Sequence, residues 1–134
     1  MGGIAIRKNG STSQTTGNNA YTQITFPVTE FNTSTVLGVV GNTVRNISDK
    51  TLLVIATGTV VASASVASLT VRLSKVSDTT NAIGFMETTN TRAAVTAGIV
   101  SLAPNDSIQL ETYNQITTAD QRNRLSVGVL AILD

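Results

Sequence analysis

The sequence predicts an all-β protein, an antiparallel jelly-roll β-sandwich of about eight to ten short strands with an extended N-terminal arm. Three observations lead to this prediction. Val, Thr and Ile, whose branched side chains suit a pleated sheet, recur throughout the 134 residues, and charged residues make up only 13%. Short alternating segments are separated by Gly, Asn, Ser and Pro. No segment carries an apolar stripe at helical spacing.

The first twenty residues differ from the rest of the chain. Residues 4–7 can make a short strand, but residues 9–20 contain no large apolar side chain and are rich in Gly, Ser, Thr and Asn. Such a stretch has no face to bury, so we expect it to be held by its own domain or by a partner. The sequence therefore predicts an N-terminal arm, residues 1–20, and a sandwich domain, residues 21–134. The predicted anchors of the arm on a partner are Ile4, Ile6, Arg7 and Lys8.

Strand signals continue from residue 21. Residues 21–28 alternate, although Pro27 restricts that segment to a sheet edge or a bulge. Residues 52–61 are apolar on both faces at their start, which indicates a strand covered on both sides. The Ser- and Ala-rich residues 62–68 are predicted as a linker. Further strands are expected over residues 36–40, 43–47, 69–74, 83–87, 92–100 and 107–113.

The last strand is the most informative segment. Leu125, Val127 and Val129 alternate on one face, while Leu130 and Ile132 make the outer half of the other face apolar as well. A strand that is apolar on both faces is covered on both faces, and in a small β-domain the second cover is often another subunit. We therefore expect this strand to be central in its sheet and to form an interface between copies. The predicted interface residues are Leu125, Val127, Val129, Leu130 and Ile132.

The residue inventory leaves little material for catalysis. The chain has no His and no Cys, and its eight carboxylates are dispersed. No phosphate loop, nucleophile elbow or HExxH motif is present. We therefore expect no enzyme activity and no cofactor. Asp49, Asp78 and Asp120 are candidate calcium ligands in loops, but their spacing does not match a calcium loop, so no metal site is predicted.

Charge and hydropathy exclude two classes of partner. The net charge is +1, and the Lys and Arg residues are scattered, so the basic stripe of a nucleic-acid binder is missing. No apolar run reaches the roughly 18 residues that a membrane-spanning helix needs. We expect neither nucleic acid nor membrane among the partners.

The last forty residues resemble a known family. An apolar strand that starts near Val95 leads to Leu102, a turn follows that ends at the acidic Asp106, and an alternating strand comes next. With the polar loop and apolar strand after it, this layout resembles the end of C1q/TNF-like jelly-roll domains, where the turn often reads Leu-x-x-Gly-Asp. Asn105 stands where Gly is usual, and the aromatic positions typical of animal members are largely missing. Phages use similar jelly rolls as capsid decoration proteins and fibre heads. These phage domains, like the animal domains, are typically homotrimers, so the resemblance implies a homotrimer.

These observations favour a structural role on a virion. The first hypothesis is a homotrimeric phage capsid decoration (cement) protein, located on the capsid surface, that stabilises the head by contacts with the major capsid protein. In this hypothesis the terminal strand builds the trimer and the arm lies along the capsid. The alternative is a trimeric fibre or spike head that binds a host-surface glycan or receptor. A C1q-like ligand-binding domain of a larger protein is a third possibility.

Overall fold

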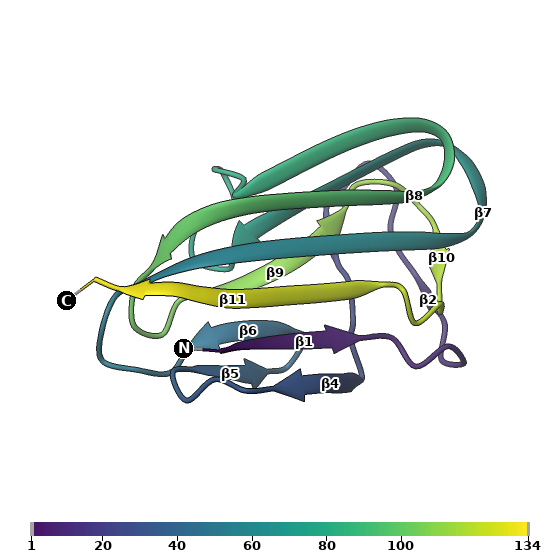
Figure 1. Ribbon diagram of the computed structural model, residues 1–134. Helices are drawn as coiled ribbons and strands as arrows, with labels where there is room; N and C mark the ends of the chain where they lie inside the picture. The colour runs from purple at the N-terminus through teal and green to yellow at the C-terminus, as the bar shows by residue number, and fades with distance from the viewer. Residues whose placement is uncertain (1, 134) are drawn as a thin grey trace.

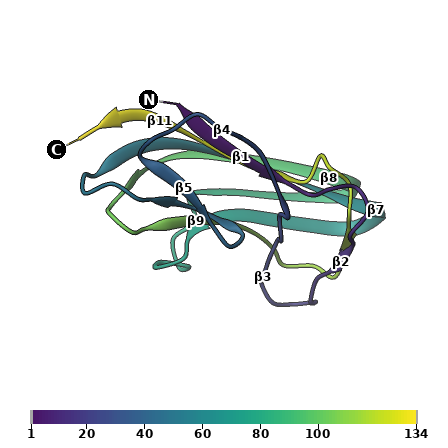
Figure 2. The same ribbon diagram turned by 90° about the horizontal axis from the view of Figure 1, so that it is seen from below.

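A computed structural model describes residues 2–133 and shows two layers of β-strands packed face to face (Figures 1 and 2). No helix occurs within that range, so none of its segments is a helix able to cross a membrane. The strands are β1 Gly3–Arg7, β2 Gln14–Thr15, β3 Thr22–Gln23, β4 Val28–Asn32, β5 Leu37–Val40, β6 Thr43–Asn46, β7 Leu52–Lys75, β8 Gly84–Leu102, β9 Ser107–Thr112, β10 Thr117–Thr118 and β11 Arg124–Ile132.

Two long strands tie the layers together. The main sheet has the order β4-β1-β11-β7-β9-β6-β5, with β8 along β7 and β3 beside β9, and its pairs are antiparallel. We call the layer of β4, β1, β11 and the first half of β7 with the second half of β8 the front sheet. The back sheet contains β5, β6, β9, β3 and the other halves of β7 and β8. The predicted antiparallel jelly-roll sandwich is confirmed, and β11 is central, between β1 and β7.

The small-residue segment predicted as a linker is instead the bend of a continuous strand. Val61 pairs with Ala93 and Val66 pairs with Thr91, so residues 62–65 of β7 form a bulge. The buried Asn123 fixes the start of the bend, because its Oδ1 accepts a hydrogen bond from the Val61 amide at 2.8 Å and its Nδ2 donates to the Val61 carbonyl at 3.0 Å. Small side chains allow β7 to turn from one layer to the other without ending.

The core lies between the layers and is built from alternate residues of each strand. In β7, Val54 and Ala56 are fully buried while the intervening Ile55 is exposed. In the back sheet Leu69, Val71 and Leu73 are fully buried. This alternation gives each layer one face that the chain itself covers and one face that it does not.

Two glycines allow the halves of β8 to meet at the side of the sandwich. A Cβ on Gly84 would lie 2.6 Å from the carbonyl oxygen of Ala97, and a Cβ on Gly98 would overlap the carbonyl oxygen of Ile83. The close approach of the two layers at this edge therefore requires the absence of a side chain at both positions.

The structure corrects the predicted N-terminal arm. β1 lies between β4 and β11, with Gly3 opposite Gly128 and Arg7 opposite Arg124. Ile4 and Ile6 are fully buried in the core of their own domain. The boundary at residue 20 therefore does not separate an arm from a sandwich. The alternation of residues 4–7 was the correct signal, but it belongs to a central strand.

The polar residues that follow β1 are held by hydrogen bonds. Lys8 is 1% exposed, and its ammonium donates to Gln14 Oε1 at 3.0 Å and to the carbonyl and hydroxyl oxygens of Thr25 at 2.8 and 3.1 Å. The Thr16 hydroxyl donates to the carbonyl of Asn114 at 2.6 Å. Lys8 is thus a buried internal donor, and burial lowers its pKa to about 8.

Substitution of Gly98 tests the closure of the sandwich. Gly98→Ala should lower the free energy of unfolding by about 1–3 kcal/mol, because the added methyl group must displace the Ile83 carbonyl. Gly17→Ala is the matched control, since a Cβ there lies 3.4 Å from the Thr22 hydroxyl, an ordinary contact. Thermal and chemical denaturation measure both. Equal stability of the two variants would show that the halves of β8 do not meet this closely.

The buried Lys8 predicts a dependence of stability on pH. Between about pH 8 and its ordinary pKa of 10.5, Lys8 is protonated in the unfolded chain and largely neutral in the folded protein. The unfolded state then binds more protons, so the free energy of unfolding should rise with pH across this window. Denaturation curves of the wild type and of Lys8→Met isolate the effect, because the variant lacks this rise. Parallel pH profiles would contradict the assignment.

Candidate self-association surface

The outer face of the front sheet is apolar although the chain leaves it open. Ile55 of β7 lies opposite Ile99 of β8, and the two side chains are 40% and 60% exposed. On the other side of Ile55 the register places Gly128 of β11, which has no side chain to project. Neighbouring rows on this face bring small residues together, with Thr57 opposite Ala97. We call this surface the front face; its residues are Phe31, Ile55, Thr57, Val95, Ala97, Ile99 and Gly128.

The shape and composition of the front face suit contact with another protein surface. Small residues in the centre of the face project little from the sheet. The half-exposed Phe31 and Val95 lie on the opposite edge strands, β4 and β8. The central cores of protein interfaces are apolar and depleted of charge. Half-exposed apolar side chains gathered on one sheet face, around Thr57 and Ser126, mark a candidate interaction site.

Charged residues gather at one end of this face. Glu30 of β4 lies 3.6 Å from Arg7 Nε and 3.4 Å from a terminal nitrogen of Arg124. One carboxylate therefore serves two guanidinium groups. Arg124 Nε is buried and has no hydrogen-bond acceptor within the described residues. A buried donor without an acceptor is costly, so an acceptor from outside the chain would stabilise this end of the face.

The structure divides the predicted interface residues into two groups. Leu125 is fully buried and Val127 is 2% exposed, and both belong to the core of their own subunit. They are therefore not available to a partner, because their face of the strand is the covered one. Val129 is partly buried against the core, whereas Leu130 and Ile132 are exposed. Leu130 lies at the register shift between Val129 and Ala131 and has no residue opposite it in β7.

The sequence pattern contained a signal for the residues that were missed. The segment over residues 52–61 is apolar on both faces at its start, as the terminal strand is, and its outward residue Ile55 lies at the centre of the front face. Ile99 belongs to a similar apolar run in β8. What the sequence does not contain is the register that places these strands side by side with β11.

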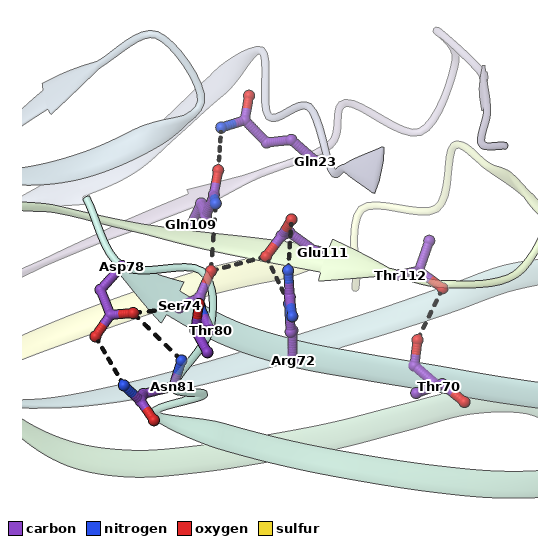
Figure 3. Close-up of polar contacts among 10 residues, drawn as sticks. All are labelled: Gln23, Thr70, Arg72, Ser74, Asp78, Thr80, Asn81, Gln109, Glu111 and Thr112. Atoms are coloured by element: carbon purple, nitrogen blue, oxygen red, sulfur yellow. Dashed lines mark hydrogen bonds and ion pairs between the residues drawn. The ribbon is translucent and has the colours of Figure 1, made fainter. Parts of the chain in front are cut away.

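The outer face of the back sheet is polar and is satisfied by its own side chains (Figure 3). Arg72 Nε donates to Glu111 Oε1 at 2.9 Å, and the Ser74 hydroxyl donates to the same oxygen at 2.7 Å. Gln109 donates to Ser74 at 3.2 Å and accepts from Gln23 at 2.8 Å. This network connects β7, β9 and β3. The middle of the back sheet is therefore covered by its own polar groups, in contrast to the front face, while Phe85, opposite Arg72 at the β8 edge, stays half exposed.

An aromatic pair adjoins this network. The rings of Tyr21 and Tyr113 have centroids 5.2 Å apart, and the Arg72 guanidinium lies 3.5 Å from the centroid of the Tyr21 ring. Contacts of this kind rigidify a polar surface. The two residues are far apart in the sequence, so their meeting could not be predicted.

The loop carboxylates considered as calcium ligands pair within their own loops. Asp78 accepts hydrogen bonds from the side chain and backbone of Asn81 and from the Thr80 backbone, and these bonds lower its pKa. Arg122 forms a two-point contact with Asp120 and lowers the pKa of that carboxyl to about 2. Within residues 2–133 no group of three His, Cys, Asp or Glu side chains is arranged to hold a metal ion.

Comparison with known proteins identifies the fold. The sequence matches no protein-family profile and no curated protein. Among solved structures, murine APRIL at pH 8.0 is similar with a TM-score of 0.75 and 12% identity, over 96% of this chain and 98% of that one. The globular domain of zebrafish complement 1qA has a TM-score of 0.61 and 10% identity, over 99% and 100% of the two chains. PRD1 vertex protein P5 has a TM-score of 0.66 and 10% identity, over 97% of each. The chain thus has the C1q/TNF-like jelly-roll fold, as the sequence pattern indicated.

A charge placed on the front face tests its role in self-association. Ile99→Asp should leave the fold intact, because this side chain is exposed in the single chain, but it should prevent copies from associating, because an interface core excludes an unpaired charge. Light scattering on a sizing column measures the mass. Ile47→Asp is the control, since Ile47 is 55% exposed but lies after β6 in the back sheet. An Ile99→Asp variant with the wild-type oligomer mass would remove the front face from assembly.

Proposed function

We propose that this protein is a structural component of a virus particle, a homotrimeric decoration protein that binds the outside of a phage capsid and stabilises the head through the major capsid protein. The observation that carries the proposal is the front face. Its sheet buries one side in its own core and leaves a second apolar side open. Burial of that side between copies removes it from water and stabilises the assembly.

A second apolar patch supports a closed ring rather than a two-fold pair. In a two-fold dimer one patch meets its own copy, whereas a ring joins one patch to a different one. Phe85 and Met86 are 53% and 41% exposed in the half of β8 that forms an edge of the back sheet. The front face of one copy packed against this edge of the next forms a ring, and the C1q/TNF-like fold favours three members.

The virion role draws on the comparison and on the chemistry of the chain. PRD1 vertex protein P5 shares this fold over almost its whole length. Four of the described carboxylates, Glu30, Asp106, Glu111 and Asp120, form ion pairs within the chain, and the Ser74 hydroxyl beside Glu111 is buried in the network of the back sheet. These observations support a role in binding.

Attachment to the capsid is assigned to the end of the sandwich where β1 starts and β11 finishes. Since Ile4 and Ile6 are buried, the contact that the sequence placed on a flexible arm needs another surface. Ile47, Ile132 and Leu133 are about half exposed there, and the Leu133 amide donates to the Thr51 carbonyl at 2.8 Å, which holds the two segments together. An apolar patch at one end of each copy gives a ring a flat base for docking.

A fibre or spike head is the second candidate. The observation that favours it is a cleft at the opposite end of the sandwich from the predicted base. Location on the particle discriminates the two, because a decoration protein covers the head whereas a fibre head occurs in few copies at the tail.

Electron cryomicroscopy of intact particles that carry the protein tests the proposal. We expect three-fold densities of this size in many copies over the head. Particles lacking the protein should regain these densities with wild-type protein and not with Ile47→Asp, although that variant remains trimeric in solution. Val76→Asp, also half exposed but in the loop after β7, should bind as the wild type does. Density confined to the tail tip would contradict the decoration role and support the fibre head.

A further inference from the structure

A cleft lies at the end of the sandwich away from the predicted base, where β7 bends. One wall is the bulge of β7, with Ser63, Ala64 and Val66. The other wall is the β2–β10 ribbon with the residues before it, including Gln115 and Thr117. The labels of β7, β10 and β2 lie together at this end in Figure 1. The cleft has a volume of about 230 Å³.

Buried polar residues fix both walls in place. On the ribbon side Thr16 is 3% exposed; its hydroxyl accepts a hydrogen bond from the Ile116 amide at 3.0 Å, and its own amide donates to the Ile116 carbonyl at 2.9 Å. On the bulge side Asn123 binds both backbone groups of Val61. The cleft is therefore formed before any ligand arrives, so binding does not require ordering of its walls.

The lining combines uncharged hydrogen-bonding groups with small aliphatic ones. Ser63 and Gln115 are exposed, and their side chains have no hydrogen-bond partner within the described part of the chain. The hydroxyls of Thr15 and Thr117 bond each other at 3.2 Å at the rim. Ala64 and Val66 add aliphatic groups to the lining. No charged side chain lines the cleft, so it offers nothing to stabilise an ionised ligand.

We propose that this cleft binds a neutral sugar ring, such as a terminal residue of a surface polysaccharide. A pyranose presents an apolar C–H face and a rim of hydroxyls that both donate and accept hydrogen bonds. The aliphatic groups of the bulge can pack against the C–H face. The amide of Gln115 and the hydroxyls of Ser63 and Thr117 can hydrogen-bond to the sugar hydroxyls. The volume lies below the roughly 300–1,000 Å³ of pockets for drug-sized ligands, which indicates about one ring.

This binding does not depend on where the protein sits on a particle. A single ring in an open cleft should bind weakly, with a Kd on the order of millimolar. Several cleft copies on one assembly would raise the avidity for a polysaccharide by about 100-fold or more where the geometry allows simultaneous contact. Adhesion to a sugar-coated surface is thus a function that either a decorated head or a fibre head could use.

Nuclear magnetic resonance titration of the assembled wild-type protein tests the proposal. The probes are methyl glycosides of the neutral hexoses, 6-deoxyhexoses and N-acetylhexosamines, with methyl glucuronide as the charged comparison. We expect saturable shifts of the backbone amides of Ser63, Ala64 and Gln115 with at least one neutral glycoside. The glucuronide should cause no such shifts.

Two variants make the test specific to the cleft. Ser63→Phe fills the cleft and should abolish the shifts, while Ser65→Phe, an exposed position on the same bend that does not line the cleft, should retain them. The one-dimensional spectrum of each variant shows that it is folded. Absence of shifts with every neutral glycoside overturns the proposal. Shifts centred on Tyr21 and Tyr113, or shifts that survive Ser63→Phe, would move the site elsewhere and overturn the assignment to this cleft.

Discussion

The covering of apolar sheet faces is the constraint on which the rest of this structure depends. Each layer buries one face in the common core. The side chains on the two outer faces therefore decide which surfaces the molecule offers to other molecules. The outer face of the back sheet carries the hydrogen-bond network of Arg72, Glu111, Ser74 and Gln109. The outer face of the front sheet carries small residues together with Ile55 and Ile99, whose exposed apolar side chains are unfavourable in water. This difference is the basis of the proposed association of copies.

The fold that creates this difference is held by a few positions. The bend of β7 lets one strand serve both layers, and Asn123 fixes that bend. Gly84 and Gly98 let the two halves of β8 approach at the edge. The same bend opens the cleft at one end, so the proposed self-association and the proposed sugar site both arise from the way in which β7 and β8 cross between layers.

Patterns within one strand could be predicted from the sequence, and patterns between strands could not. The two apolar faces of the terminal strand correctly indicated its central position, and the series of short strands separated by turns correctly indicated the jelly roll. The same reasoning assigned Leu125 and Val127 to a partner, because alternation shows that a face is covered but not by what. β1 was missed as a central strand because its strand partners lie 21 to 125 positions away in the chain. The burial of Lys8 depends on its hydrogen bonds to Gln14 and Thr25, and no sequence pattern predicts these contacts.

Thiol accessibility reports whether copies of this chain cover the front face. The chain has no Cys, so a single introduced cysteine reports one position. Ala97→Cys lies on the front face and Thr89→Cys on the bend of β8, and both positions are exposed in the single chain. In native protein we expect Ala97→Cys to react with a maleimide far more slowly than Thr89→Cys, and at the same rate after denaturation. Equal rates in the native state would contradict the account.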